Sequence, residues 1–263
     1  MMTPYLRCIL APNAGPMTLD GTNTWLLGDP TRGPTVVVDP GPADDHHLEL
    51  IMDACAGGIS DILLTHWHHD HSDAAPALAQ LAGCGVRAAD PVFAVPDPRT
   101  GPSAMPDGTA ITAPGAELTV IVTPGHTQDS LSFLLRGQDG ACWLLTGDMV
   151  LGRGTTVIMH PDGNLGAYLR SLDRMERVVH DFGVAQILPG HGPRVASPGE
   201  LLRSYRTHRL ERLQQVREAV AAGARTAAEV AAVVYADVPD GVRQAAERSV
   251  AAQLDYLSEP GSE

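Results

Sequence analysis

Short apolar segments separated by glycine- and proline-rich turns dominate the first three quarters of the chain. Their composition predicts buried strands near residues 5–10, 23–27, 35–39, 59–65, 86–89, 117–123, 130–135, 142–145 and 184–188. Helices are predicted at 43–55, from a Ser72 cap to about 81, and at 165–182, where apolar side chains recur every three to four residues. Strands that alternate with helices indicate a layered α/β architecture.

The last quarter of the chain has a different pattern. After Ser197-Pro198-Gly199 it is rich in alanine, and helices are predicted at about 200–222, after the capping box Thr226–Glu229, and after Asp240. The segment 91–114, with six prolines, is predicted to be a loop. We therefore expect a large domain at 1–198 and a small helical domain at 199–263.

Composition narrows the kinds of partner that the chain can have. Apolar residues make up 44% of the 263 residues and aromatic residues only 4%, so a large core of aliphatic side chains can form. The net charge of −13 argues against a general attraction to nucleic acid or to an anionic membrane. Residues 194–217 are an exception, because they hold six arginines and two glutamates.

The cysteines and the distribution of apolar residues indicate a compartment. Four cysteines stand far apart without a CxxC pair, which predicts reduced thiols. Neither a secretory signal nor an apolar run of ~18 residues occurs. We expect a soluble, cytoplasmic protein with no membrane partner, and the sequence leaves its oligomeric state open.

The stretch Leu64–Ser72 carries the strongest chemical signal. Five of its nine side chains can bind a metal ion: His66, His68, His69, Asp70 and His71. Three later predicted strands also end in turns with a possible ligand, namely His126, Asp148 and His191. Because sites in layered α/β folds collect at the carboxyl ends of strands, we expect these residues to form a two-metal hydrolytic site at one edge.

Thr65–His71 has the form of the HxHxDH signature of the metallo-β-lactamase superfamily, and the three later turns follow in the order of that family's remaining ligands. The resemblance covers roughly residues 5–195 and implies a four-layer αββα sandwich. It implies that His66, His68 and His126 hold one metal ion. It also implies that Asp70, His71 and His191 hold a second one, and that Asp148 bridges the two.

The same resemblance implies the chemistry of the site. Two divalent ions, with zinc as first choice and manganese or iron as alternatives, would lower the pKa of a shared water from ~15.7 towards ~7. The resulting bridging hydroxide would attack an ester-type centre, with Asp70 and Asp148 as the catalytic carboxylates. Asp39 resembles the aspartate that positions ligand histidines, although the sequence is equally compatible with a turn-capping role.

Other histidines are expected to lie outside the centre. His69 occupies the variable position of the signature and is not expected to bind metal. A surface or helix position is expected for His46, His47, His160, His180 and His208, and a packing role for Tyr168.

Departures from other branches narrow the resemblance to the glyoxalase-II-like hydrolases. Class B β-lactamases lack a bridging aspartate, flavin-linked members replace a ligand histidine, and tRNA-maturing members carry a long insertion that this chain lacks. The helical tail and the loop Thr18–Thr24 resemble the branch with a C-terminal winged-helix-like domain. Its characterised members are endoribonucleases that act on single-stranded RNA.

The resemblance therefore predicts a dinuclear hydrolase of an ester-type bond. A phosphodiester such as single-stranded RNA is the first choice and a thioester is the alternative, so the expected partner is RNA or an anionic small molecule. A hypothesis of another class makes the tail a nucleic-acid-binding regulatory module with a secondary metal site. The complete ligand set and the lack of residues for a β-hairpin wing count against that hypothesis.

Overall fold

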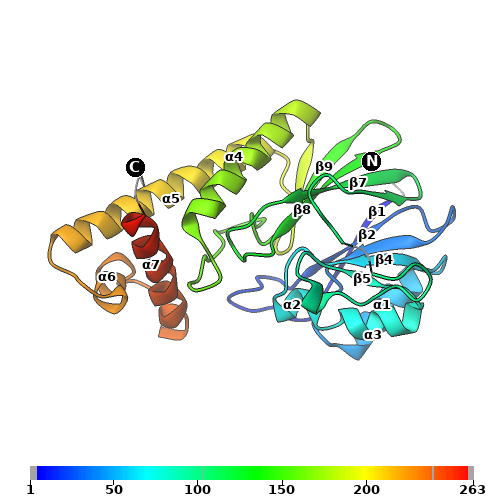
Figure 1. The fold of residues 1–263 in the computed structure, drawn as a ribbon, viewed down its shortest axis with the longest axis horizontal. Helices are drawn as coiled ribbons and strands as arrows, with labels where there is room; N and C mark the ends of the chain where they lie inside the picture. The colour runs from blue at the N-terminus through cyan, green and yellow to red at the C-terminus, as the bar shows by residue number, and fades with distance from the viewer. Residues whose placement is uncertain (1–4, 103, 239, 260–263) are drawn as a thin grey trace.

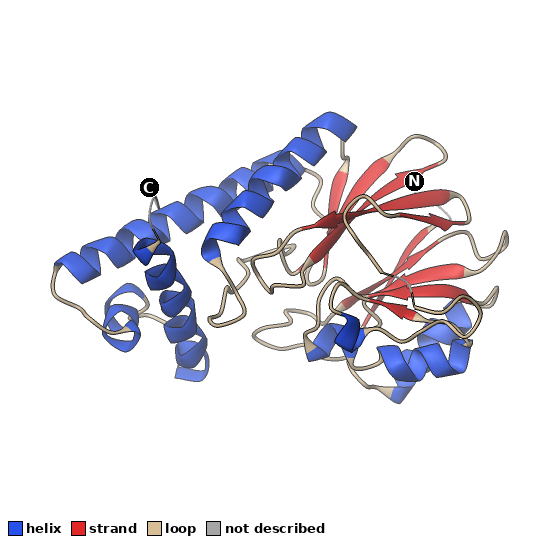
Figure 2. Ribbon diagram, in the orientation of Figure 1, coloured by secondary structure: helices blue, strands red, loops and turns tan. Residues whose placement is uncertain are grey.

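Two five-stranded sheets lie face to face in the computed structural model, which describes residues 5–102, 104–238 and 240–259. Helices cover the outer face of each sheet (Figures 1 and 2). The order of layers is helix, sheet, sheet, helix, so the predicted four-layer αββα sandwich is confirmed.

The N-terminal part of the chain forms the first sheet, in the order β1-β2-β3-β4-β5. Its strands are β1 (Leu6–Leu10), β2 (Asn23–Leu27), β3 (Thr35–Val38), β4 (Ile59–Leu63) and β5 (Val86–Arg87). The pairs from β1 to β3 are antiparallel and those from β3 to β5 are parallel. Helices α1 (Asp45–Ala54) and α3 (Ala75–Ala82) bury Ile51 and Leu78 against this sheet.

The second sheet has the order β10-β9-β8-β7-β6, with only β9 and β10 parallel. Its strands are β6 (Ala110–Ala113), β7 (Ala116–Val122), β8 (Leu131–Gly137), β9 (Cys142–Gly147) and β10 (Gln186–Pro189). Helix α4 (Leu165–Phe182) packs on its outer face, because Leu165, Leu172 and Met175 form one apolar stripe.

The main core fills the space between the two sheets. Val36 and Val38 of β3 belong to the same buried cluster as Leu118 of β7 and Phe133 of β8. The sheets are also joined by hydrogen bonds at one edge, where Asn23 donates its backbone N–H to Gly190 O (2.8 Å). The Asn23 side-chain amide donates to the carbonyl oxygens of Pro189 (3.0 Å) and Gly192 (2.8 Å).

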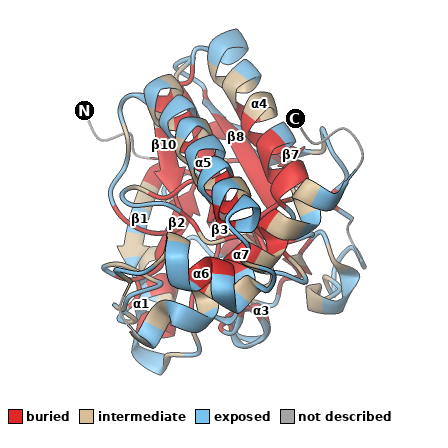
Figure 3. Cartoon of the chain, turned by 90° about the vertical axis from the view of Figure 1, so that its left-hand side faces the viewer, coloured by how far each residue is buried: buried red, intermediate tan, exposed pale blue. Residues whose placement is uncertain are grey.

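Three helices follow the second sheet: α5 (Pro198–Ala221), α6 (Ala227–Val234) and α7 (Arg243–Ser258), the last preceded by the 3-10 turn η2 (Asp240–Val242). The first half of α5 packs with α4 through Leu202 and Tyr205, and its second half packs with α6 and α7 through Val216 and Ala219. Figure 3 views the molecule from this end, with α5 and α6 towards the reader. Helix α5 is therefore part of two cores.

Two local predictions are wrong. Ser72 does not cap a helix, because it is itself the last residue of the single helical turn α2 (His69–Ser72), where its hydroxyl donates to Trp67 O (2.8 Å). The segment 91–114 is not all loop, since it contains the turn η1 (Pro91–Phe93) and the edge strand β6. The capping box at Thr226 and Glu229 is confirmed.

No helix in the part of the chain that the structure describes is long and apolar enough to cross a membrane.

Candidate metal centre

All seven residues that the sequence singles out lie on turns after four strands. His66 and His68 follow β4, and the helical turn α2 adds Asp70 and His71. The other three follow β7, β9 and β10. Their ligand atoms form three groups, each within 4.8 Å: His66, His68 and His126; His66, His71 and Asp148; Asp70, His71 and His191.

The first group consists of three imidazole nitrogens that face one another. His68 Nδ1 lies 3.0 Å from His66 Nε2 and 3.0 Å from His126 Nε2. His126 Nδ1 lies 2.7 Å from the carbonyl oxygen of Val157, which can only accept a hydrogen bond. His126 therefore carries its proton on Nδ1 and presents the lone pair of Nε2 to the group.

Asp39 fixes the protons of two further histidines. Its carboxylate accepts the Thr65 backbone N–H (2.8 Å) and the Thr65 hydroxyl (2.7 Å), and it lies 2.9 Å from His71 Nδ1. Because the Thr65 hydroxyl donates to Asp39, it accepts from His66 Nδ1, 3.0 Å away. Both rings thus turn the lone pair of Nε2 inwards. Asp39 is buried and has φ +53°, a strained backbone that this network holds in place.

The second group contains His71, His191 and Asp70. The two Nε2 atoms lie 3.2 Å apart, and His191 Nδ1 is bound by Gly21 O at 3.1 Å. Asp70 Oδ2 lies 3.2 Å from His191 Nε2 and 3.7 Å from His71 Nε2. This group therefore combines two inward lone pairs with a carboxylate.

Asp148 stands between the two groups. Its Oδ1 lies 3.4 Å from His71 Nε2, and its Oδ2 lies 3.4 Å from His191 Nε2 and 3.9 Å from His126 Nε2. Although Asp148 is almost wholly buried, Oδ1 makes no hydrogen bond among the described residues. A buried, unsatisfied carboxylate oxygen is costly, and a cation would satisfy it.

The electrostatics of the two groups differ. Burial lowers the pKa of His66 well below its usual value and that of His68 to about 4, and neighbouring histidines add to both effects. Burial also disfavours charge on His191, but Asp148 and Asp70 outweigh it and raise the pKa to about 9. Burial likewise opposes ionisation of Asp148, yet His191 and His71 hold its pKa well below the usual range. The first group is neutral at pH 7, and the second attracts positive charge.

The loop after β9 connects this centre to the C-terminal helices. His126 Nδ1 also lies 3.2 Å from Thr156 Oγ1, and Arg209 of α5 donates to Thr156 O. Tyr205 of α5 accepts the backbone N–H of Leu151 (2.9 Å). Helix α5 therefore supports the loop that orients a candidate ligand.

Sequence reasoning missed several of these supporting residues. Thr65 stands directly before the signature, so its position was a usable signal. Thr156 and Arg209 belong to no motif, and only the folded chain brings them to His126. Tyr168 is buried as expected, and its hydroxyl donates to Met149 O in the same loop (2.6 Å).

The remaining histidines lie outside the centre. His69 is exposed and pairs with Asp73 at 2.8 Å. His47 lies on α1 as expected but is fully buried, because its Nε2 contacts Thr24 Oγ1 (2.9 Å) beneath the centre.

A cleft of about 210 Å³ opens beside the centre. His126 and Asp148 form its floor, and its walls are Pro16, Met17, Leu19, Leu151, Arg153, Gly154, Thr155, Thr156 and Val157. The walls are largely apolar, which suits a substrate with an uncharged portion near the centre.

The chain belongs to the metallo-beta-lactamase superfamily, whose family model matches residues 17–191 and so includes all seven candidate ligands. It is accordingly a hydrolase, with His/Asp clusters compatible with a dinuclear metal site. The model of the beta-lactamase associated winged helix domain matches residues 226–262, so the branch indicated by the tail is confirmed.

Individual relatives cover nearly the whole chain. Lactamase-like protein adaB of Aspergillus niger is 32% identical over 261 residues, which are 93% of this chain and 77% of that protein. A protein of Aspergillus fumigatus named atrochrysone carboxyl ACP thioesterase is 31% identical over 258 residues, covering 92% and 77%. The crystal structure of a metallo-beta-lactamase family protein from Thermus thermophilus superposes with a TM-score of 0.78 at 23% identity, covering 98% and 95%. The shared fold thus includes the helical tail.

Proposed function

We propose that this chain is a dinuclear metal-dependent hydrolase that cleaves acyl thioesters. The observation that carries the metal assignment is the direction of the histidine protons. Four rings, those of His66, His71, His126 and His191, have Nδ1 bound to an oxygen, so their Nε2 lone pairs converge. In the first group, where burial keeps the rings neutral, the nitrogens face one another at 3.0 Å and repel unless a proton or a cation lies between them.

The residues fit two cations. His66, His68 and His126 would hold one, Asp70, His71 and His191 the other, and Asp148 would contact both. Nitrogen and carboxylate ligands of this kind suit zinc, with manganese or iron as alternatives. When bound, such ions supply Lewis acidity and a water nucleophile with a pKa near ~7.

The protein's own groups would orient the reaction. The Asp70 side chain is 29% exposed, against 10% for Asp148, so Asp70 is the more solvent-accessible of the two carboxylates. Burial opposes its ionisation, but hydrogen bonding to His191 keeps its pKa below the usual value, so it is an acceptor at neutral pH. Asp70 would accept a hydrogen bond from the attacking water, and Asp148 would hold the two groups together.

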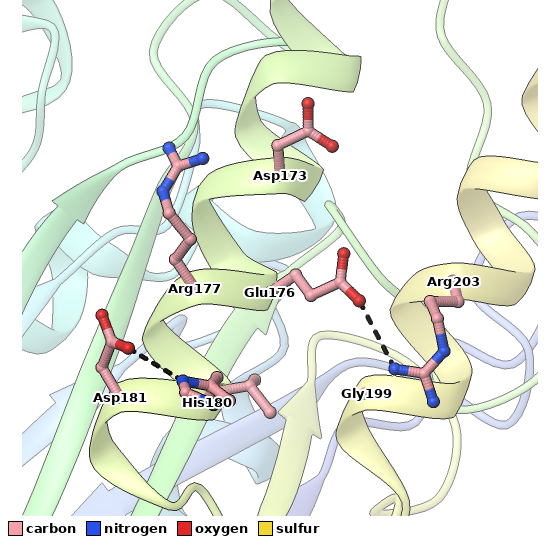
Figure 4. Close-up of a pocket in the computed structure, with 8 residues that line it drawn as sticks. Asp173, Glu176, Arg177, His180, Asp181, Gly199 and Arg203 are labelled. Carbon is pink, nitrogen blue, oxygen red and sulfur yellow. Dashed lines mark hydrogen bonds and ion pairs between the residues drawn. The ribbon is translucent and has the colours of Figure 1, made fainter.

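Two observations favour a thioester over RNA. The first is the relative whose name describes a carrier-protein thioesterase. The second is that two of the six arginines that motivated the RNA prediction are neutralised by ion pairs on the exposed face of α5: Arg203 pairs with Glu176 (3.4 Å) and Arg206 with Asp173 (2.5 Å). Figure 4 shows the first pair across the groove between α4 and α5, which is lined by both acidic and basic side chains. A surface of paired charges attracts a polyanion weakly.

The metal assignment is tested by metal analysis of purified protein. We expect about two transition-metal ions per chain, and about one in Asp148→Ala, because the residue shared by both groups is lost. The control Asp181→Ala removes an exposed carboxylate on α4 and should keep both ions. Full metal content in Asp148→Ala would contradict the shared role.

The substrate is tested with one panel: a glutathione thioester, single-stranded RNA, an aryl phosphodiester and a chromogenic cephalosporin. We expect metal-dependent thioester hydrolysis that Asp70→Ala abolishes. RNA cleavage that depends on Asp70, without thioester hydrolysis, would overturn the thioester proposal in favour of the RNA prediction made from the sequence.

A further inference from the structure

A second cavity, of about 290 Å³, lies between the C-terminal helices and the loop that supports His126. We call it the α5–α7 pocket. It is lined by Pro16, Met17, Thr155, Thr156, Val157, His208, Arg209, Arg212, Tyr235, Val238, Val242, Ala245, Ala246 and Ser249. Five of these, Pro16, Met17, Thr155, Thr156 and Val157, also line the cleft beside the metal centre. The pocket therefore adjoins the cleft, on the side away from the candidate ligands.

The pocket is basic in an acidic protein. Among the described residues that line it are Arg209, Arg212 and His208 and no carboxylate, whereas the whole chain has a net charge of −13. Neither arginine forms an ion pair with a carboxylate of the described residues, unlike Arg203 and Arg206 on the same helix. Two guanidinium groups without a counter-charge favour binding of an anion.

Unsatisfied polar atoms point to the same conclusion. Arg209 is only 6% exposed, and its Nε makes no hydrogen bond within the described residues. The same is true of the buried His208 Nδ1. Burial lowers the pKa of His208, and the charges of Arg209 and Arg212 add to this effect, which indicates a positive potential at this end of the pocket. Buried polar atoms without partners are costly unless a ligand supplies the missing hydrogen bonds.

The Arg212 side chain is fixed in position by its contacts within the C-terminal helices. Its Nη1 donates to the carbonyl oxygen of Val234 and to Gln215 (both 2.8 Å), and its guanidinium lies 4.5 Å from the centre of the Tyr235 ring. Both hydrogen bonds use the same nitrogen, so the other edge of the guanidinium is left for an anion. A side chain fixed in this way loses little conformational entropy when it binds.

We propose that the α5–α7 pocket binds an anionic group of the substrate, a phosphate or carboxylate that lies away from the bond cleaved at the metal centre. The identity of the ligand as part of a thioester rests on the proposed function. The charge has two possible sources, the thiol arm or the far end of the acyl chain. In either case the C-terminal helices select the substrate and the metal centre cleaves it.

Binding without turnover tests the pocket. The probes are pantetheine 4′-phosphate and pantetheine, which differ only in the phosphate, titrated into the metal-loaded full chain by calorimetry. If the thiol arm carries the charge, the phosphate should tighten binding about tenfold or more. Arg212→Gln should abolish that preference, and the matched control Arg203→Gln, on the exposed part of α5, should retain it.

Kinetics test the acyl source. An acyl-pantetheine with a terminal carboxylate is compared with its methyl ester, and the preference should appear as a lower KM that Arg212→Gln removes while kcat stays. Because Arg212 also binds Val234 O, a second variant, Ala245→Glu, places a carboxylate in the pocket without removing a contact. It should weaken anion binding in the same way.

The outcomes separate the two proposals. A phosphate or carboxylate preference that Arg212→Gln and Ala245→Glu both abolish supports the pocket, even if no thioester is cleaved and the proposed function falls. Thioester hydrolysis with no charge preference, or with a preference that both variants keep, overturns the pocket and leaves the proposed function standing.

Discussion

The position of single protons on histidine rings determines what this centre can bind. Asp39 is the residue that decides it most directly, since one buried carboxylate sets the proton on Nδ1 of His71 and, through Thr65, on Nδ1 of His66. An asparagine at this position would be uncharged, and its amide nitrogen could not accept the hydrogens of the Thr65 hydroxyl and of His71 Nδ1. The ligand atoms are thus oriented by contacts that exist without a metal ion.

A carboxylate beside the centre has a measurable effect on stability. Asp129 is half-buried near Trp67, and burial, reinforced by Asp162, raises its pKa to about 6. Its folded pKa exceeds the unfolded value of 3.8, so the folded state holds the proton more tightly. The free energy of unfolding therefore falls as pH rises from about 4 to about 6 and stays lower above that.

Asp129→Asn removes this cost and keeps the oxygen that accepts the Thr127 hydroxyl (2.7 Å). We expect the variant to be more stable than the wild type by about 1 kcal/mol at pH 7.5, discounted for partial exposure, and equal to it at pH 4. Urea unfolding of both proteins with the same excess of chelator measures the difference. A gap that is independent of pH would contradict the titration.

The sequence identified residues that carry a fixed motif and missed those placed only by folding. The candidate ligands in His66–His71 and the later candidates His126, Asp148 and His191 could be proposed from the sequence because they follow strands in recognisable turns. Arg209 lies 53 residues beyond the Thr156 carbonyl that it binds, and nothing in the local pattern links the two. Ser72 was misplaced because a potential helix cap and a residue of a ligand-bearing turn look alike in sequence.

At the scale of elements, the stability of a short helix depends on how the backbone groups at its ends are hydrogen-bonded. Helix α6 has only eight residues, and its capping box satisfies backbone groups that would otherwise lack partners. Its Val230 is buried in the small core with Val216 and Val250, so the helix is also anchored by packing.

Thr226→Ala tests the contribution of this cap. The Thr226 hydroxyl accepts the Glu229 N–H (3.2 Å), and its loss should lower the free energy of unfolding by about 1 kcal/mol. The control Thr207→Ala, exposed on α5, should change stability by less than about 0.5 kcal/mol. Urea titration followed by circular dichroism compares the two, and equal stabilities would show that packing alone holds α6.

At the scale of the molecule, α5 makes the helical tail part of the catalytic unit. It contributes Leu202 and Tyr205 to the core beneath the second sheet, and Arg209 to the loop that orients His126. The domain boundary predicted at residue 198 stays a prediction. Helix α5 begins at Pro198, and it packs both against the second sheet's core and against the core of the C-terminal helices. Changes in the tail should therefore reach the metal centre.

Arg209→Met measures that coupling. Methionine is of similar length and can still pack over the Tyr168 ring, where the guanidinium lies 5.2 Å from the ring centre, but it cannot donate to Thr156 O, so the His126 ring loses part of its support. We expect the ion at His66, His68 and His126 to bind about tenfold more weakly, with the other ion unchanged. Competition with a chelator resolves the two ions, and Arg203→Met is the control. Equal weakening of both would indicate a global effect instead.

The hydrogen bonds from Asn23 to the end of β10 and the turn after it can form only late in folding. As the chain is synthesised, His71 is made 120 residues before His191, and Asn23 must wait 166 residues for the Pro189 carbonyl. Closing loops of this length is slow and happens only when the two sheets dock. We expect the candidate ligands that are made before His191 to bind metal only weakly until that step. We therefore expect selective binding of two ions only after the two sheets have docked, so that metal availability at that stage would contribute to which ion is bound.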